Sequence, residues 1–131
     1  NDACKQAIVS QRIVINANPR IRRDFIPVNS VCKISEYLLC DRPLFKDPLL
    51  NVGSGVSYSL LSIAEIIADR CQLLFGFHPE ILFSDDSLNT SECFDYRVDK
   101  LISKMGYSTN NDLNSPIDEV LNFCFENFSK I

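Results

Sequence analysis

The sequence predicts an α/β fold, a small mixed domain of about four helices and four or five short strands that spans residues 1–131. Two observations predict it. Segments whose apolar residues recur at helical spacing alternate along the chain with short runs of β-branched and aromatic residues. In addition, 46% of the 131 residues are hydrophobic and 23% are charged, which is typical of one globular domain with a buried core.

The first segments of the chain alternate between helix and strand. We expect a short helix at Asp2–Ser10, a strand at Arg12–Ile15 and a second extended segment at residues 25–28. Residues 16–19 read Asn-Ala-Asn-Pro. They predict a turn, because Asn tolerates unusual backbone angles and Pro disfavours helix at the residue before it.

Two longer helices occupy the middle of the chain. The first runs from a cap at Asn29 or Ser30 to about Cys40. Ser59 caps the second and clearest helix, and Gly76 ends it. The apolar face of this second helix consists of Leu60, Ile63, Ala64, Ile67, Cys71 and Leu74.

The remaining elements are shorter. Apolar or β-branched runs at residues 49–52, at Glu80–Phe83 and at residues 94–98 predict strands. Asp99–Met105 predicts a short helix. The last helix is expected to begin at a Ser115 cap, which is followed by a proline at the first helical position and a carboxylate at the positive end.

Composition and charge exclude several classes of function. Thirteen Lys and Arg against 17 Asp and Glu give a net charge of −4, which argues against non-specific nucleic-acid binding because such binding needs a basic surface. No apolar run approaches the roughly 20 residues that cross a bilayer, and the amino terminus lacks a signal-peptide pattern. We therefore expect a soluble cytoplasmic protein without nucleic-acid or membrane partners.

The cysteines are scattered along the chain with no Cys-x-x-Cys pair, and several lie on apolar stripes. They are Cys4, Cys32, Cys40, Cys71, Cys93 and Cys124. Buried, reduced thiols are favoured, and a disulfide framework or a zinc site is the alternative.

Arginines at positions 20, 22 and 23 concentrate positive charge just before an extended segment. A guanidinium group matches phosphate oxygens in a two-point geometry that lysine cannot copy, so this cluster is a candidate phosphate site. The alternative is a solvated basic turn, which is the expected role of Arg20 and Arg22.

Two further motifs suggest coenzyme chemistry but do not fit it. Asn-Val-Gly-Ser-Gly at residues 51–55 precedes a helix, yet the third glycine of a Gly-x-Gly-x-x-Gly loop would be the bulky Tyr58. Tyr96 and Lys100 have the spacing of a catalytic Tyr-x-x-x-Lys pair, but Tyr96 falls in a predicted strand, so the two side chains need not meet. We interpret both glycines of the first motif as structural and the Tyr–Lys spacing as coincidence.

Four segments in the same order resemble one known family. Arg-Asp-Phe-Ile-Pro-Val at residues 23–28 is followed by Asn-Val-Gly-Ser-Gly at 51–55, by a Ser-led helix at 58–65 and by Asp-Tyr-Arg-Val-Asp-Lys at 95–100. This order resembles the carboxyl-terminal half of the NAD-dependent sugar-nucleotide epimerases and dehydratases, the extended short-chain dehydrogenase/reductase family. The resemblance runs from about Arg12 to the carboxyl terminus, and nothing in the chain resembles the family's amino-terminal coenzyme domain.

The resemblance implies that this chain is the carboxyl-terminal substrate-binding domain of a larger two-domain enzyme and lacks the Rossmann half. That half would bind NAD or NADP and supply the catalytic Tyr and Lys. This chain alone is therefore expected to hold no catalytic residue, coenzyme or metal, and to be inactive. The complete enzyme would oxidise a sugar carbon by hydride transfer to NAD, and the keto intermediate would then be epimerised, dehydrated or reduced.

The ligand that the resemblance implies is a nucleoside diphosphate-sugar. In this alignment Arg23 contacts the pyrophosphate, Tyr96 helps to accommodate the sugar, and Glu92 can hold the ribose. The backbone groups of Ile13 and Ile15 line the slot for the base, whereas their side chains are expected to serve the core.

One loop departs from the family pattern and keeps alternatives open. Residues 84–92 lack the second arginine that contacts the phosphate in the family. The chain could instead be a stand-alone module that binds nucleotide-sugars or another protein, or part of a reductase of the same superfamily with a non-nucleotide substrate. If the strand at residues 49–52 normally lies in a larger sheet, its unpaired edge also predicts a homodimer or partial disorder.

Overall fold

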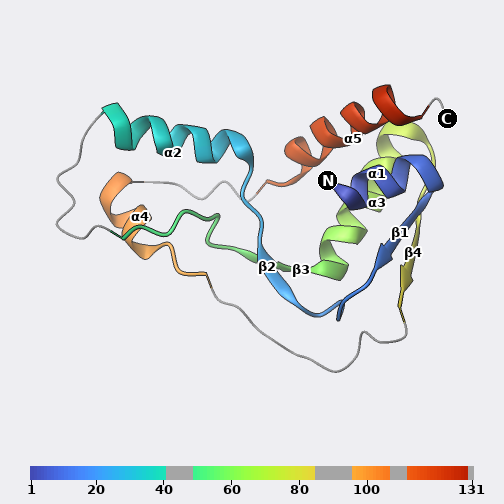
Figure 1. Cartoon of the computed structure of the whole chain (residues 1–131), viewed down its shortest axis with the longest axis horizontal. Coiled ribbons are helices and arrows are strands. Elements are labelled where there is room, and N and C mark those ends of the chain that lie inside the picture. Colours follow the sequence, from blue (N-terminus) through green and yellow to red (C-terminus); the bar gives the residue numbers. More distant parts are fainter. Residues whose placement is uncertain (41–48, 85–95, 107–111, 130–131) are drawn as a thin grey trace. The chain divides into compact units, whose positions relative to one another are not determined.

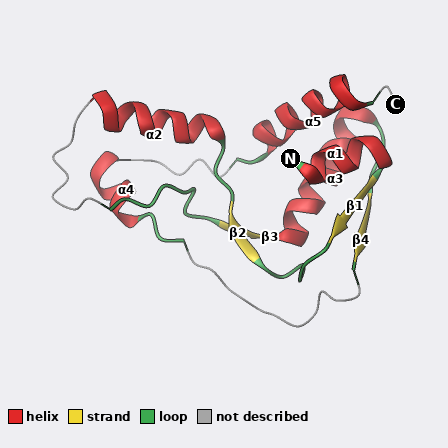
Figure 2. Cartoon of the chain, in the orientation of Figure 1, coloured by secondary structure: helices red, strands yellow, loops and turns green. Residues whose placement is uncertain are grey.

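The computed structural model describes residues 1–40, 49–84, 96–106 and 112–129. Five helices and four strands follow one another in these ranges, so the predicted small mixed α/β fold is confirmed (Figures 1 and 2). No helix in the described ranges is long and apolar enough to cross a membrane.

The chain forms two compact units, each assembled from separate stretches of sequence. Unit 1 comprises Asn1–Arg22, Tyr58–Cys93 and Asp112–Ile131, and unit 2 comprises Arg23–Ser57 and Phe94–Asn111. One domain can contain two such units, so the expectation of a single domain stays a prediction.

Unit 1 is a two-stranded parallel sheet with three helices packed together beside it. The elements are α1 (Asp2–Ser10), β1 (Arg12–Ile15), α3 (Leu60–Phe75), β4 (Glu80–Phe83) and α5 (Asn114–Phe128). The strands β1 and β4 pair in register along their whole length, and α1, α3 and α5 contact one another (Figure 1). The bounds of α1, β1 and β4 are those that the sequence predicts.

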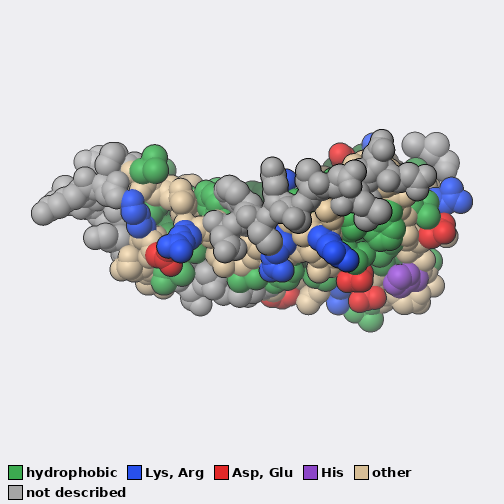
Figure 3. All heavy atoms as spheres, turned by 90° about the horizontal axis from the view of Figure 1, so that it is seen from below, with side chains coloured by type: hydrophobic (Ala, Val, Ile, Leu, Met, Phe, Trp, Pro, Cys, Tyr) green, Lys and Arg blue, Asp and Glu red, His purple; other side chains and the backbone are tan. Residues whose placement is uncertain are grey.

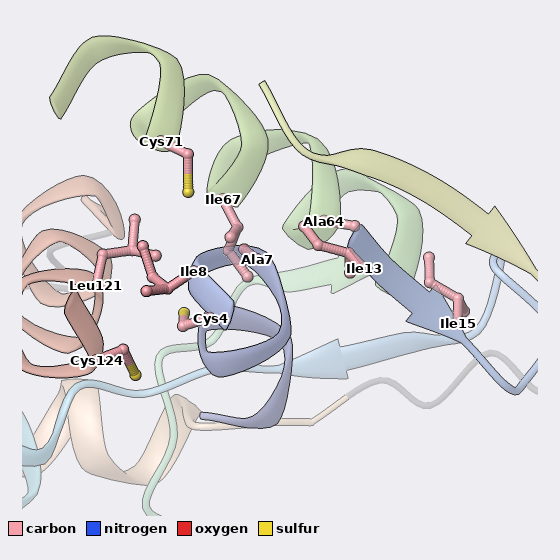
Figure 4. Close-up of a cluster of buried hydrophobic side chains, with 10 residues drawn as sticks. All are labelled: Cys4, Ala7, Ile8, Ile13, Ile15, Ala64, Ile67, Cys71, Leu121 and Cys124. Carbon is pink, nitrogen blue, oxygen red and sulfur yellow. The ribbon is translucent and has the colours of Figure 1, made fainter. Parts of the chain in front are cut away.

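The core of unit 1 joins side chains from β1 and all three helices (Figure 4). Ile13 and Ile15 are 1% and 7% exposed, because alternate residues of a strand point to the same face. Leu121 of α5 is fully buried. The buried members of the cluster are Cys4, Ala7, Ile8, Ile13, Ile15, Ala64, Ile67, Cys71, Leu121 and Cys124.

The helix α3 begins and ends at the predicted signals. The Ser59 hydroxyl accepts a hydrogen bond from the Ser62 amide (2.9 Å), and Gly76 has a φ of 78°, which a residue with a Cβ adopts only at a cost. The predicted apolar face is correct except at Leu74, which is 38% exposed, while Ala68 is fully buried.

The start of α5 differs from the prediction. The helix begins at Asn114 rather than after a Ser115 cap. The residue at its amino-terminal cap position, Leu113, makes no side-chain capping hydrogen bond. Instead the Asp112 carboxylate, two residues before the helix begins, accepts a hydrogen bond from the Asn114 amide (2.9 Å).

Unit 2 contains two helices, α2 (Val28–Cys40) and α4 (Asp99–Met105), around a smaller core. The buried residues of this core are Ile34, Val98 and Leu101. Its partly buried neighbours are Ile26, Leu38, Leu50, Val52 and Tyr96. Two short strands, β2 (Arg22–Asp24) and β3 (Ser57–Ser59), pair with each other, and each contains a boundary between the units.

The extended segment predicted at residues 25–28 is wrong at Val28, which belongs to a helix, and residues 25–27 are not part of a strand. The strand β2 ends at Asp24, and α2 already begins at Val28. Pro27 explains the difference, because it has no amide to donate to a strand partner, while its carbonyl accepts hydrogen bonds from the amides of Ser30 (3.0 Å) and Val31 (3.2 Å) at the start of the helix.

The strand predicted at residues 49–52 is also wrong. Leu50 and Val52 pack on the core of unit 2 while Leu49 and Asn51 are exposed, so the segment alternates as an extended chain does but belongs to no sheet. The argument for a homodimer through this edge therefore does not hold, and the homodimer itself stays a prediction.

The strand predicted at residues 94–98 is wrong for residues 96–98, which precede α4 without strand structure. Residues 94 and 95 lie outside the described ranges.

The cysteines divide into two groups. Cys4, Cys71 and Cys124 are buried free thiols in unit 1, as expected, whereas Cys32 and Cys40 on α2 are free but exposed. Burial raises the pKa of Cys4 and of Cys71 to about 11. Cys93 lies outside the described ranges, and within them no three metal-binding side chains come together.

Candidate functional site

The predicted site residues fall into both units. Arg23, on β2, is exposed, and Tyr96, just before α4, is partly buried; both belong to unit 2. Ile13 and Ile15 lie on β1 in unit 1, where their side chains are in the core as expected, and the Ile15 carbonyl accepts the Ser84 amide (3.2 Å). The proposed contact of their backbone with a base stays a prediction. Glu92 lies outside the described residues.

The centre of the candidate site is a hydrogen-bonded loop held by Asp24. One carboxylate oxygen, Oδ1, accepts a hydrogen bond from the Ser54 amide (2.8 Å), and the other, Oδ2, accepts one from the Gly55 amide (2.7 Å). Hydrogen bonds from amides to a carboxylate are stronger than those between neutral groups. Asp24 therefore fixes the loop to the end of β2, next to Arg23.

Tyr96 packs directly on this loop at Gly53. A Cβ built on Gly53 would lie 2.6 Å from Cδ1 and 2.7 Å from Cε1 of the Tyr96 ring, and 3.0 Å from Oδ2 of Asp24. These distances are too short for any side chain, so only glycine allows the ring to approach. The position of the ring and the position of the loop therefore depend on each other.

Further contacts make the loop rigid. The Ser54 hydroxyl donates to the Val56 carbonyl (3.0 Å) and accepts from the Val56 amide (3.1 Å), and Ser54 is only 4% exposed. Gly55 has a φ of 75°, which favours glycine. Both glycines of the motif thus have the structural role that the sequence predicts, Gly53 for close approach and Gly55 for its backbone angle.

A second connection joins the loop to the segment that carries Tyr96. The Asn51 side-chain amide donates to the carbonyl of Arg97, the residue after Tyr96 (3.1 Å). Tyr96 also packs against the core formed by Ile34, Val98 and Leu101. The segments around Asp24, Gly53 and Tyr96 are therefore tied together within one unit although they are far apart in the sequence.

The loop does not fit a coenzyme phosphate. A phosphate-binding loop presents free amides to the ligand, but here the amides of Ser54 and Gly55 already bind the carboxylate of Asp24. A phosphate at these amides would also meet the negative charge of that carboxylate. The chemistry of this loop is that of a structural turn.

The spacing of Tyr96 and Lys100 also follows the expected interpretation. The helix α4 starts at Asp99, so Lys100 lies in its first turn and Tyr96 lies outside it. The two residues are not one helical turn apart on a common face, as a catalytic Tyr-x-x-x-Lys pair requires.

Each unit has a hollow on its surface. The one in unit 2, about 190 Å³, lies beside the Asn51–Arg97 connection and is lined by Leu49, Asn51, Arg97, Val98, Asp99 and Lys100. A larger one of about 370 Å³ lies in unit 1 between α1 and α5. The larger hollow contains none of the predicted site residues, so size alone does not identify the site.

Charged side chains of both signs are mixed on the surface shown in Figure 3. On this face the Lys and Arg side chains of the described residues lie in separate groups, and Asp and Glu side chains lie beside several of them. Any role of Arg23 with an anion therefore depends on its own local geometry.

Sequence reasoning missed Asp24 and Asn51 as parts of the site. A signal for Asp24 is present in the sequence, because the amides of a tight Gly-Ser-Gly turn need acceptors and a carboxylate at the end of a strand can supply two. Its distance of 30 residues from the loop hides the pairing. Asn51 carries no comparable signal.

Comparisons with known proteins identify the fold. No family model matches the chain, and no curated protein matches it. Among solved structures, the chain is similar to RMD from Pseudomonas aeruginosa in complex with NADPH, with a TM-score of 0.77 and 18% identity over 95% of this chain and 41% of that one.

Two further structures are similar at the same level. A UDP-N-acetylglucosamine 4-epimerase from Methanobrevibacter ruminantium gives a TM-score of 0.72 and 19% identity over 95% of this chain and 38% of that one. A dTDP-glucose 4,6-dehydratase from Bacillus anthracis, in complex with NAD, gives a TM-score of 0.71 and 12% identity over 95% of this chain and 38% of that one. The chain therefore has the fold of the carboxyl-terminal part of NAD(P)-dependent epimerases and dehydratases, as the resemblance implied, and it spans about two fifths of their length.

Proposed function

We propose that this chain, with the fold just identified, is the substrate-binding part of an NAD(P)-dependent sugar-nucleotide epimerase or dehydratase. In this proposal it binds a nucleoside diphosphate-sugar, while an amino-terminal Rossmann domain binds NAD or NADP and supplies the catalytic Tyr and Lys. The observation that carries the proposal is the match of 95% of this chain to only 41% of a structure that binds NADPH.

The arrangement within unit 2 supports the proposal. Arg23 is exposed in the middle of β2, and in this proposal its guanidinium contacts the diphosphate oxygens of the ligand. Asp24, the next residue, fixes the loop on which the Tyr96 ring packs. A positive group for the diphosphate and an aromatic ring for the sugar are thus carried by one connected framework.

The test is to titrate a UDP-sugar, a dTDP-sugar and a GDP-sugar into the 131-residue chain and into the longer enzyme that the proposal implies. We expect the longer enzyme to bind one of them at least about tenfold more tightly than the chain alone, because its site is complete. Micromolar binding by the chain alone would instead favour a stand-alone module.

The Arg23→Ala variant tests the phosphate contact. In the longer enzyme it should weaken binding by about tenfold or more, since a charge-assisted hydrogen bond is lost. Arg12→Ala is the matched control, because Arg12 is an exposed arginine of unit 1 whose ion pair with Glu80 is 3.7 Å long. Unchanged affinity in Arg23→Ala would contradict the phosphate contact and favour a reductase with a non-nucleotide substrate.

A further inference from the structure

A single carboxylate connects the two predicted ligand-binding residues of unit 2. Asp24 follows Arg23 directly, and its two oxygens accept the amides of Ser54 (2.8 Å) and Gly55 (2.7 Å). The Tyr96 ring packs against the preceding residue of that loop, Gly53.

We propose that Asp24 is a positioning residue for Tyr96: by fixing the Gly53–Gly55 loop, it sets the orientation of the aromatic ring that contacts the ligand. This inference rests on the proposed function for the role of Tyr96 and adds a residue to it. Asp24 itself does not touch the ligand, because both of its oxygens face the loop amides.

The geometry supports coupling from the carboxylate to the ring. The position of a Cβ on Gly53 is within 3.0 Å of Asp24 Oδ2 and within 2.7 Å of two ring atoms of Tyr96, so the glycine is enclosed between them. Gly53 and Ser54 are buried, which leaves the loop little room to move without the ring. A shift of the loop amides away from β2 would therefore open the contact at the ring.

Asp24→Asn is the informative substitution because it keeps the shape of the side chain. The Ser54 and Gly55 amides bond different oxygens of Asp24, so in the same orientation an asparagine keeps an acceptor for only one of them and turns its NH₂ group, which can only donate, toward the other. The substitution also removes a negative charge next to Arg23. Electrostatics alone would thus strengthen the binding of an anionic diphosphate, whereas loss of positioning would weaken it, and the two explanations predict opposite signs.

The first readout is the ring itself. The chain has four tyrosines, and 3-fluorotyrosine labelling gives each a fluorine NMR signal, with Tyr96→Phe assigning the signal of interest. We expect Asp24→Asn and Gly53→Ala each to shift or broaden the Tyr96 signal. Glu36→Gln, an exposed carboxylate on α2 in the same unit, should leave it unchanged. An unchanged Tyr96 signal in Asp24→Asn would overturn the proposal.

The second readout is affinity for whichever UDP-, dTDP- or GDP-sugar the wild-type longer enzyme binds. Asp24→Asn should weaken binding by about tenfold, the usual effect of losing one charge-assisted hydrogen bond in a rigid framework. In a Tyr96→Ala background the same substitution should have almost no effect, because both changes act on one group. Equal weakening in both backgrounds, or tighter binding, would overturn positioning.

The two readouts separate this inference from the proposed function. If no nucleotide-sugar binds, the proposed function fails, and the fluorine signal still decides whether Asp24 orients the ring. If the ligand binds but neither the signal nor the affinity responds to Asp24→Asn, the function stands and the positioning fails. If thermal melting shows that Asp24→Asn does not fold, Gly53→Ala provides the test instead. An unchanged Tyr96 fluorine signal in Gly53→Ala would then overturn the proposal.

Discussion

Arg70 on α3 and Asp118 on α5 form a two-point ion pair that joins two helices of unit 1. The Arg70 Nε donates to Oδ1 of Asp118 (2.7 Å) and Nη2 donates to Oδ2 (2.5 Å). Both side chains are only 22% exposed, and the hydrogen bonds to Asp118 raise the pKa of Arg70. This paired, fork-shaped geometry gives the α3–α5 contact a fixed orientation that apolar packing alone does not.

We expect Arg70→Lys to lower the melting temperature of the chain, because a lysine cannot make the two parallel hydrogen bonds. Arg70→Met should lower it further, since it leaves the Asp118 carboxylate without its partner in a half-buried position. The control is Arg12→Lys at the exposed Arg12–Glu80 pair, whose side chains are 62% and 63% exposed. Thermal unfolding followed by circular dichroism measures all three variants. An equal fall of the melting temperature at the two ion pairs would contradict the structural role of the Arg70–Asp118 pair.

Leu121 is the core residue of α5 that should be most sensitive to truncation. It is fully buried in the unit 1 cluster, so Leu121→Ala should lower the free energy of unfolding by about 2–5 kcal/mol. Leu73→Ala is the matched control on α3, because Leu73 is 69% exposed and should change stability by less than about 0.5 kcal/mol. Urea unfolding of both variants tests the difference, which would vanish if Leu121 were not part of a packed core.

The cap of α3 can be tested without touching the core. Ser59→Ala removes the acceptor of the Ser62 amide and should cost about 1 kcal/mol. Ser59→Asp keeps an acceptor at the same place and should retain most of the stability. Chemical unfolding of the pair separates capping from general sensitivity at this position, since the loss should occur in the alanine variant alone.

The buried thiols make stability fall at high pH. The ordinary pKa of these thiols is 9.0, and burial raises it to about 11 for Cys4 and Cys71 in the folded chain. The folded state therefore holds protons that the unfolded state loses between pH 9 and 11. The contribution of these thiols to the free energy of unfolding is fully present below pH 9. Toward pH 11 it declines by up to about 1.4 kcal/mol per pH unit for each thiol.

Replacing one thiol isolates this effect from the titration of lysines and tyrosines. In Cys71→Ala the fall of the unfolding free energy between pH 9 and 11 should be less steep than in the wild type, even if the variant is less stable at pH 7. Leu73→Ala, an exposed position without a titratable group, should keep the wild-type slope. Identical slopes in all three proteins would show that burial does not alter the titration of Cys71.

Local signals predicted the elements of the chain better than its sheets. The bounds of α1, β1, β4 and α4 follow from residues that are neighbours in sequence, such as the β-branched run at Arg12–Ile15 and the glycine after Met105. The strand expected at residues 49–52 did not form, nor did the described part, residues 96–98, of the strand expected at 94–98. A strand also needs a partner, and the partner is a property of the whole fold. An extended segment can show alternating exposure without forming hydrogen bonds to a neighbouring strand.

The site shows the same limit. Arg23 and Tyr96 were predicted as ligand-binding residues from the family motif, but the carboxylate of Asp24, which holds the Ser54–Gly55 turn, lies 30 residues from that turn in the sequence. Likewise, Arg70 and Asp118 are 48 positions apart in the sequence, and no local pattern indicates that these side chains meet. Contacts over such distances depend on how the elements pack, which no short sequence window contains.

The interleaving of the two units has a practical consequence for anyone who wishes to dissect the protein. Unit 1 is built from three stretches of the chain and unit 2 from two, so the backbone changes unit at four places. Neither unit can be excised with one pair of cut sites, and a truncation before α5 would remove Leu121 and Cys124 from the core of a unit that begins at the amino terminus. Experiments on either unit therefore need both units on one polypeptide.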